Sequence, residues 1–268
     1  MQTELASCIA RHSADKTVCY KTVAGEALSL ALFLPQGKPP FRTLLLIHGG
    51  GWRSRKIFED QSCWQGDYLG FLARYFADRG WLCACIDYRL MRGHGQEPGF
   101  GLAELTQDCV DAAAYLLENA EEFGADPRTL SLLGESAGGY LAARASLALP
   151  VHSLILVNPI TDLTIDDWSS YAPENWSFQE RSAAHLIRQD MPQTLLLHGT
   201  DDTVVLPEHS KRFAQKMLEA GNPCALHFLE HARHAFLLAE YYPGGTDCCE
   251  TAMQIIQNHL NSEGEKSL

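Results

Sequence analysis

Residues 134–139, Gly-Glu-Ser-Ala-Gly-Gly, constrain the fold of this chain more than any other stretch. They follow the apolar run 129–133 and precede the Ala- and Leu-rich run 140–149. This pattern predicts a buried strand, a sharp turn and a helix, with the hydroxyl of Ser136 at the helix N-terminus. Glycines suit such a turn because they carry no Cβ that would collide with the neighbouring strand and helix. The alternative interpretation is an ordinary helix entry with a glycine-rich turn.

Apolar and amphipathic runs alternate along the rest of the chain. The sequence predicts strands at residues 17–23, 27–34, 43–47, 81–86, 129–133, 153–157, 194–197 and 225–229. It predicts helices at residues 68–79, 102–118, 140–149, 207–220 and 251–260. We expect the first two strands to form a hairpin at Gly25-Glu26. The alternation that follows predicts an α/β fold, with a mainly parallel central sheet of about eight strands flanked by helices.

Polar groups follow the same end of five predicted strands. These groups are His48-Gly49-Gly50-Gly51-Trp52, Asp87-Tyr88-Arg89, Ser136, His198-Gly199-Thr200-Asp201-Asp202 and Glu230-His231-Ala232-Arg233-His234. The carboxyl ends of parallel strands meet at one edge of a sheet, where active groups of such folds collect. The sequence therefore predicts a site at this edge.

Three of these residues have the types and the chain order of a serine hydrolase triad. Ser136 is the expected nucleophile, Asp202 the acid and His234 the base. Asp201 is adjacent to Asp202, but only one of two consecutive side chains can face the histidine. Asp162, after the preceding predicted strand, is the reserve acid.

His231 is the alternative base. We prefer His234 because the Ala235-Phe236 pair that follows it is typical of a packed helix start. His227, His231 and His234 are also open to interpretation as a metal cluster. The helical His-Glu-x-x-His pattern of zinc enzymes is absent, so we predict no metal and no other cofactor.

The glycines after His48 free the backbone to turn its N–H groups toward one point. An acyl-transfer site needs such donors, because its tetrahedral intermediate carries negative charge on the former carbonyl oxygen. One donor contributes about 3 kcal/mol to catalysis. We assign the oxyanion hole to the N–H groups of Gly50, Gly51 and Ala137. A phosphate-binding loop is the alternative, but no Lys-Ser/Thr pair and no G-x-G-x-x-G follows.

The charge of the chain limits its partners. Lys plus Arg is 21 and Asp plus Glu is 33, which gives a formal net charge of -12. This acidity argues against nucleic acid, because phosphate binding needs a basic surface. The sequence shows neither a secretory signal nor a membrane span. Nine cysteines without a C-x-x-C spacing do not resemble a disulfide framework, so we expect reduced thiols and a cytoplasmic location.

Taken together, the motifs resemble the α/β-hydrolase superfamily, and within it the esterases with an HGGGW oxyanion loop. That group includes hormone-sensitive-lipase-like carboxylesterases and small bacterial acetyl and feruloyl esterases. The matching segments are His48–Trp52, Asp87–Arg89, Asp126-Pro127, residues 134–139, His198–Asp202 and His234–Phe236. They extend from about residue 27 to residue 236. The resemblance implies the same triad and oxyanion hole. Glu135 departs from the aspartate of the lipase-like members, and Ala235 from the usual glycine.

The resemblance also implies a single α/β-hydrolase domain over residues 1–268, with a small cap or insert at about 161–190. Aromatic residues in this insert and in residues 53–67 suit an acyl group or a sugar face. We assign Trp52, Glu135, Trp168 and Trp176 to substrate binding.

The expected function is hydrolysis of short-chain acyl esters, acetyl esters above all, including those of carbohydrates. The expected partner is a small-molecule ester, and a homodimer stays open. Two alternatives remain. One is an amidase or peptidase such as a kynurenine-formamidase-like hydrolase, and the other is a non-catalytic ligand-binding homologue.

Overall fold

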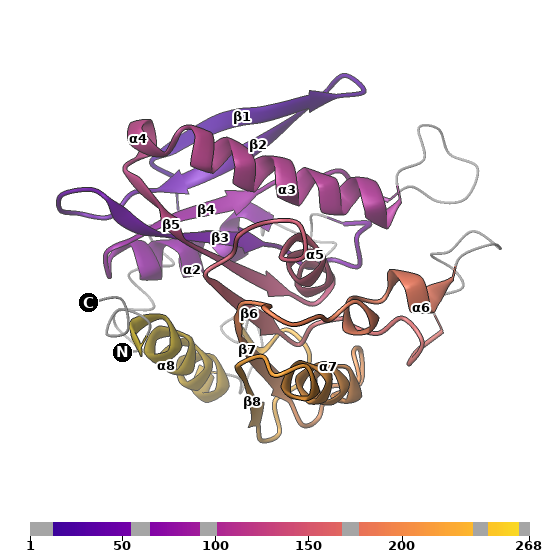
Figure 1. The fold of residues 1–268 in the computed structure, drawn as a ribbon. Helices are drawn as coiled ribbons and strands as arrows, with labels where there is room; N and C mark the ends of the chain where they lie inside the picture. Colours follow the sequence, from indigo (N-terminus) through magenta and orange to yellow (C-terminus); the bar gives the residue numbers. More distant parts are fainter. Residues whose placement is uncertain (1–12, 55–64, 92–100, 168–176, 238–245, 263–268) are drawn as a thin grey trace.

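An eight-stranded sheet organises the part of the chain that the structure, a computed structural model, describes. Those residues are 13–54, 65–91, 101–167, 177–237 and 246–262. The strands are β1 (Lys16–Val23), β2 (Glu26–Phe33), β3 (Phe41–Ile47), β4 (Trp81–Ile86), β5 (Ala125–Glu135), β6 (Ser153–Val157), β7 (Gln193–Gly199) and β8 (Cys224–Leu229). Their order is β1-β2-β4-β3-β5-β6-β7-β8 (Figure 1). The pairs β1–β2 and β2–β4 are antiparallel and the others parallel, which confirms the predicted mainly parallel sheet.

The first two strands form the predicted hairpin, with its turn one residue earlier than expected. Ala24 and Gly25 occupy the turn with φ of 51° and 80°, and Val23 pairs with Glu26. Two consecutive positive φ angles match the two-residue turns whose twist suits a hairpin.

Helices cover both faces of the sheet. The helices are α2 (Gln65–Ala77), α3 (Leu102–Glu118), α4 (Ala120–Phe123), α5 (Ala137–Ala145), α6 (Phe178–Arg181), α7 (Glu208–Glu219) and α8 (Thr246–Ser262), with a 3-10 turn η2 (Ala183–His185). One apolar core joins the sheet to α3, α5 and α7, and a second joins it to α2 and α8 (Figure 1).

Strand β3 shows how the two cores arise from one sequence run. Leu45 and Ile47 belong to the core with α5, and Leu44 and Leu46 belong to the core with α2. Side chains alternate between the two faces of a strand, so a strand covered on both faces must be apolar throughout. The continuous apolar run 43–47 meets this requirement.

Several elements differ from the prediction: β5 begins at Ala125 instead of residue 129, α2 begins at Gln65 instead of residue 68, and the short helices α4 and α6 were not predicted. Helix α5 begins at Ala137, three residues before the predicted start, because Gly138 and Gly139 pack against the sheet although they are poor helix formers. Helix α8 begins at Thr246, five residues before the predicted start. Strand β8 lies at the edge of the sheet and leaves His227 and Phe228 exposed, so it is less buried than its apolar sequence suggests.

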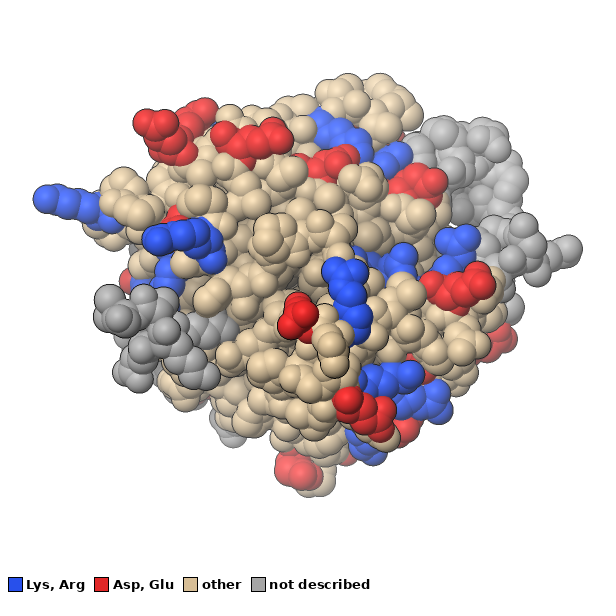
Figure 2. Space-filling model, in the orientation of Figure 1, with Lys and Arg blue, Asp and Glu red and all other residues tan. Residues whose placement is uncertain are grey.

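The described surface carries charges of both signs. Figure 2 shows acidic and basic side chains interspersed over the described part of one face. Within the described residues, no helix combines the length and the apolar character that crossing a membrane demands. The seven cysteines in these residues are free thiols.

Candidate active site

The predicted strand ends meet at one edge of the sheet. Residue Ile47 of β3 pairs with Gly134 of β5, and Glu135 pairs with Val157 of β6. At the other side of the sheet, Gly199 of β7 pairs with Leu229 of β8. The segments that follow β3, β5, β7 and β8 therefore all leave the sheet at its carboxyl edge.

Ser136 occupies a strained turn between β5 and α5. Its backbone φ and ψ are 53° and -120°, a combination that residues other than glycine rarely adopt. The turn is held by a hydrogen bond from the Ser136 N–H to the Val157 carbonyl at 2.9 Å. The Ser136 carbonyl accepts from the N–H groups of Gly139 and Ile160 at 3.0 and 3.2 Å. A backbone fixed in this way holds the hydroxyl above the sheet edge, as a nucleophile elbow does.

His234 connects Ser136 to Asp202. Its Nε2 lies 3.0 Å from the Ser136 Oγ, and its Nδ1 lies 2.7 Å from the Asp202 Oδ2. The carboxylate at Nδ1 fixes the tautomer with a proton on Nδ1, which leaves Nε2 free to accept the serine proton. This is the arrangement required for general-base activation of a serine.

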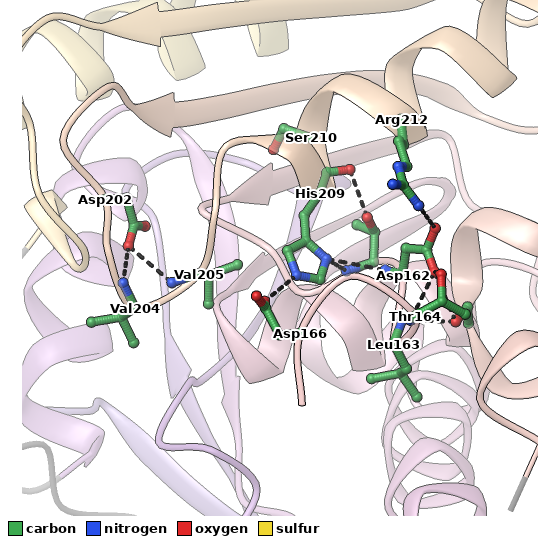
Figure 3. A network of polar contacts seen from close by, with 12 residues as sticks. Asp162, Leu163, Thr164, Asp166, Asp202, Val204, Val205, His209, Ser210 and Arg212 are labelled. Carbon is green, nitrogen blue, oxygen red and sulfur yellow. Dashed lines mark hydrogen bonds and ion pairs between the residues drawn. The ribbon is translucent and has the colours of Figure 1, made fainter. Parts of the chain in front are cut away.

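The Asp202 carboxylate is held by the turn that follows it. Its Oδ1 accepts the N–H groups of Val204 and Val205 at 2.9 and 3.0 Å (Figure 3). Burial alone would raise the pKa of Asp202, but hydrogen bonds from His198, His234 and Val205 hold that pKa well below its ordinary value. The group is therefore a carboxylate across the physiological pH range.

The alternative acids and bases lie elsewhere. Asp201 and His231 form an exposed pair with 3.5 Å between Oδ2 and Nδ1. Asp162 contacts Thr164, His185 and Arg212 instead of a histidine beside the serine. His227 is exposed on β8. Among the described residues there is no group of three or more His, Cys, Asp or Glu side chains that could hold a metal ion.

The loop after β3 carries the predicted oxyanion donors. Gly50 and Gly51 have φ of 93° and 58°, and a Cβ on Gly50 would lie 2.2 Å from the Ser54 carbonyl oxygen. Within the described part of the chain, the N–H groups of Gly50, Gly51 and Ala137 donate no backbone hydrogen bond outside helices and strands. Ala137 is also the first residue of α5, where N–H groups lack partners within the helix. All three remain candidates for an oxyanion.

Tyr88 and Trp52 fix this loop. The Tyr88 hydroxyl donates to the carbonyls of His48 and Gly49 at 2.9 and 3.2 Å, and its ring stacks on the His48 imidazole at 4.0 Å. The Trp52 Nε1 donates to the Ala137 carbonyl at 3.0 Å. These contacts join the loop to the segment after β4 and to the first turn of α5.

Two residues predicted to bind substrate are buried. Trp52 is 0% exposed and packs edge-on against Tyr140, so its ring anchors the loop. Glu135 is 2% exposed and lies beside Gly49. This burial argues against a direct substrate contact for either side chain, because a contact surface must be accessible. The other two predicted residues, Trp168 and Trp176, lie outside the described residues.

The buried Glu135 carboxyl group interacts electrostatically with Asp202 and His234, and its burial disfavours the charged form. Burial raises its pKa to about 7, and the charge of Asp202 acts in the same direction. His234 and Asn158 act in the opposite direction. Among the described residues, Oε1 has no hydrogen-bond partner. Glu135 is therefore protonated in part of the molecules near neutral pH.

Known proteins share this fold. The family model described as BD-FAE matches residues 30–154. The apo form of Thermogutta terrifontis esterase 2 superposes with a TM-score of 0.76 and 26% sequence identity, over 93% of this chain and 94% of that chain. The chain belongs to the α/β-hydrolase superfamily.

Curated relatives of this α/β-hydrolase are esterases by name. It is 26% identical to a probable isoprenylcysteine alpha-carbonyl methylesterase of Oryza sativa, over 81% of this chain and 58% of the relative. It is 29% identical to an ethyl acetate hydrolase of Pseudomonas putida, over 60% of this chain and 51% of the relative. This chain thus spans little more than half the length of these relatives.

A second polar network in the α/β-hydrolase ties the segment after β6 to α7 (Figure 3). The His209 Nε2 lies 2.8 Å from Asp166, and its Nδ1 accepts the N–H groups of Thr161 and Asp162, both at 3.2 Å. Arg212, one turn further along α7, donates to Asp162 at 3.2 Å. The sequence analysis did not single out His209. The signal that could have found it is its place among the buried positions of α7, next to Ser210.

Proposed function

We propose that this α/β-hydrolase is a serine carboxylesterase. The observation that carries the proposal is the chain of contacts from the Ser136 hydroxyl through His234 to Asp202, at 3.0 and 2.7 Å. A hydroxyl is a weak nucleophile unless a base removes its proton, and an oriented imidazole supplies that base.

The reaction takes two steps on this geometry. The Ser136 Oγ attacks the ester carbonyl while its proton moves to the His234 Nε2. The bond to the alcohol oxygen then breaks, and the alcohol leaves with that proton. A water molecule next attacks the acyl-serine, its proton moves to His234, and the acid is released as the Ser136 Oγ regains a proton.

The N–H groups of Gly50, Gly51 and Ala137 would hold the negative oxygen in both steps. The left-handed backbone angles of Gly50 and Gly51 and the place of Ala137 at the start of α5 support this assignment. Each such donor contributes about 3 kcal/mol to stabilisation of the transition state. Asp202 stabilises the imidazolium that forms on His234.

We further propose short-chain acyl esters as substrates, with acetyl esters foremost. The names of similar proteins support this range. One relative is an ethyl acetate hydrolase, and structures of Thermogutta terrifontis esterase 2 hold propionate or butyrate. The carbohydrate alcohol predicted from the sequence stays a prediction, because the aromatic residues behind it include Trp168 and Trp176, outside the described residues.

A panel of p-nitrophenyl esters with acyl chains of two to twelve carbons tests the proposal. We expect the highest kcat/KM at two to four carbons, with Ser136→Ala reducing turnover by at least about a thousandfold. An ester paired with its matching amide separates an esterase from an amidase. A preference for chains beyond eight carbons would reject the short acyl range, and equal activity of Ser136→Ala would reject the mechanism.

A further inference from the structure

A second imidazole lies against the acid of the proposed triad. The His198 Nε2 is 3.3 Å from the Asp202 Oδ2, the same oxygen that accepts from His234, and both the His198 and the Asp202 side chain are 0% exposed. His198 lies near the end of β7, four residues before Asp202. The sequence analysis included His198 among the polar residues after a predicted strand, but it did not predict which residue His198 contacts.

His198 also contacts the turn of residues 202–205 that follows β7 and contains Asp202. Its Nε2 also lies 2.9 Å from the Val205 carbonyl oxygen, and the Val205 N–H donates to the Asp202 Oδ1 at 3.0 Å. Two acceptors at Nε2 place the proton there, so that one N–H group faces both the Val205 carbonyl and the carboxylate. The turn from β7 to α7 thus forms a ring of contacts around Asp202.

Helix α7 fixes the other side of the imidazole. The His198 Nδ1 lies 2.7 Å from the Ser210 Oγ, and with the proton on Nε2 this nitrogen accepts from the hydroxyl. Ser210 is 0% exposed, so water does not compete for this contact. The imidazole is therefore held at both nitrogens, and its orientation toward Asp202 is fixed by the helix.

We propose that His198 is a positioning residue that orients Asp202 and limits its basicity toward His234. This inference rests on the proposed function. An N–H group directed at Oδ2 stabilises the carboxylate and weakens the hydrogen bond that the same oxygen offers to His234. The contact therefore limits how strongly the carboxylate holds the protonated imidazole of His234. In the part of the chain that the structure describes, Glu135 on β5 and His209 on α7 also interact electrostatically with this pair.

Two substitutions at one position separate these effects. His198→Leu removes the donor, while His198→Gln places an amide N–H where Nε2 stands. For His198→Leu we expect kcat to fall by about ten- to a hundredfold, because a misplaced acid misorients the base. We also expect the acid limb of kcat/KM to move upward by about half a pH unit, because the freed carboxylate binds the His234 imidazolium more strongly. His198→Gln should restore most of the turnover and the position of the acid limb.

Two results would contradict a positioning role for His198. An unmoved acid limb in His198→Leu, or an equal loss of turnover in both variants, would show that His198 only fills space. If His198→Leu does not fold, Ser210→Ala and Ser210→Thr carry the test. We expect a loss of kcat of about threefold only in the variant without a hydroxyl, and equal kcat values would overturn the inference.

The wild-type protein keeps the two proposals apart. Its own ester hydrolysis and its labelling by a fluorophosphonate test the proposed function. If the wild-type protein hydrolyses esters and the His198 variants share its pH profile, the positioning role alone is rejected.

Discussion

Gly138 and His48 lie so close that a Cβ on Gly138 would be 2.4 Å from the His48 carbonyl oxygen and 2.2 Å from that of Ile47. The first turn of α5, which carries the proposed nucleophile, therefore rests directly on the end of β3, which carries the proposed oxyanion loop. No side chain fits between these two backbones. The distance between nucleophile and oxyanion donors is set here.

Gly138→Ala should therefore impair both stability and catalysis. We expect the free energy of unfolding to fall by about 1–3 kcal/mol, as for other overpacked sites. The turnover should fall by about tenfold or more, because the added methyl group separates the loop from Ser136. Urea denaturation and ester kinetics measure the two effects. Gly221→Ala is the control, since a Cβ there meets no atom within 4 Å although its φ is +78°. It should lose stability and keep kcat; a normal kcat in Gly138→Ala would contradict the argument.

Two buried aspartates give a matched test of the acid. Asp202→Asn places an amide N–H or carbonyl at the His234 Nδ1 and permits the wrong tautomer, so kcat should fall by about a thousand- to ten-thousandfold. Asp162→Asn changes a carboxyl group that contacts Thr164, His185 and Arg212, and should keep kcat within about threefold while lowering stability. Steady-state kinetics decide between the two aspartates. A larger kinetic loss in Asp162→Asn would show that the acid has been misassigned.

The sequence predicted most accurately those helices and strands whose apolar pattern is compatible with only one type of secondary structure. The bounds of α3 and β6 agree with the prediction, because the periodic apolar face of α3 and the short apolar run of β6 each admit one interpretation. The start of α5 was missed because its helical glycines are explained only by close contacts with the end of β3 and with Pro159 after β6, which distant segments supply. The exposure of β8 depends on its place at the sheet edge, which strand order and not local sequence determines.

For the candidate site, the order of residues along the chain limited the possible acids to three aspartates, but it could not show which of them contacts His234. Asp201, Asp202 and Asp162 all satisfied the order, and the hydrogen bonds of Val204 and Val205 are what turn Asp202 toward His234. Trp52 was assigned to substrate because aromatic residues suit pockets. Its φ of 60° and its contact with the Ala137 carbonyl instead bury it, and neither is visible in the sequence.

The Glu135 carboxyl group should make stability depend on pH in a known direction. Its ordinary pKa of 4.5 in the unfolded chain rises to about 7 in the folded protein, so the folded state binds more protons between these values. Its contribution to stability is present below pH 4.5 and is lost as the pH rises through 7. Relative to Glu135→Gln, the free energy of unfolding of the wild-type protein should fall by about 3 kcal/mol between pH 4.5 and 8.

Urea denaturation at several pH values measures this difference. The control is Glu230→Gln, at an exposed position after β8. Its effect should stay within about 0.5 kcal/mol, as for most surface substitutions. A wild-type protein that gains stability over Glu135→Gln as the pH rises would contradict the raised pKa of Glu135.

His209 should destabilise the protein in acid. Burial lowers its pKa below the ordinary value of 6.5, against the opposing effect of Asp166. Protonation of Nδ1 would direct a proton at the N–H groups of Thr161 and Asp162. The contribution of His209 is therefore present above pH 6.5 and is lost as the pH falls toward its lower folded pKa, by at most about 1.4 kcal/mol per pH unit.

His209→Asn keeps an acceptor near Nδ1 and cannot titrate. The free energy of unfolding of the wild-type protein should exceed that of this variant by less at pH 5 than at pH 7. The control is His231→Asn, at an exposed imidazole, for which the difference from the wild-type protein should change less. Thermal or urea unfolding across this range provides the measurement. An advantage that grows in acid would mean that His209 gains protons on folding.

Reaction with a fluorophosphonate followed by mass spectrometry of the intact protein and of its peptides tests the central claim most directly. An activated serine beside an oxyanion hole forms a stable phosphonyl ester, whereas an ordinary serine does not react. We predict one adduct per chain, on the peptide that contains Ser136, absent in Ser136→Ala and formed far more slowly in His234→Ala. A wild-type protein that stays unmodified, or carries the adduct on another serine, would contradict the assignment of Ser136, His234 and Asp202.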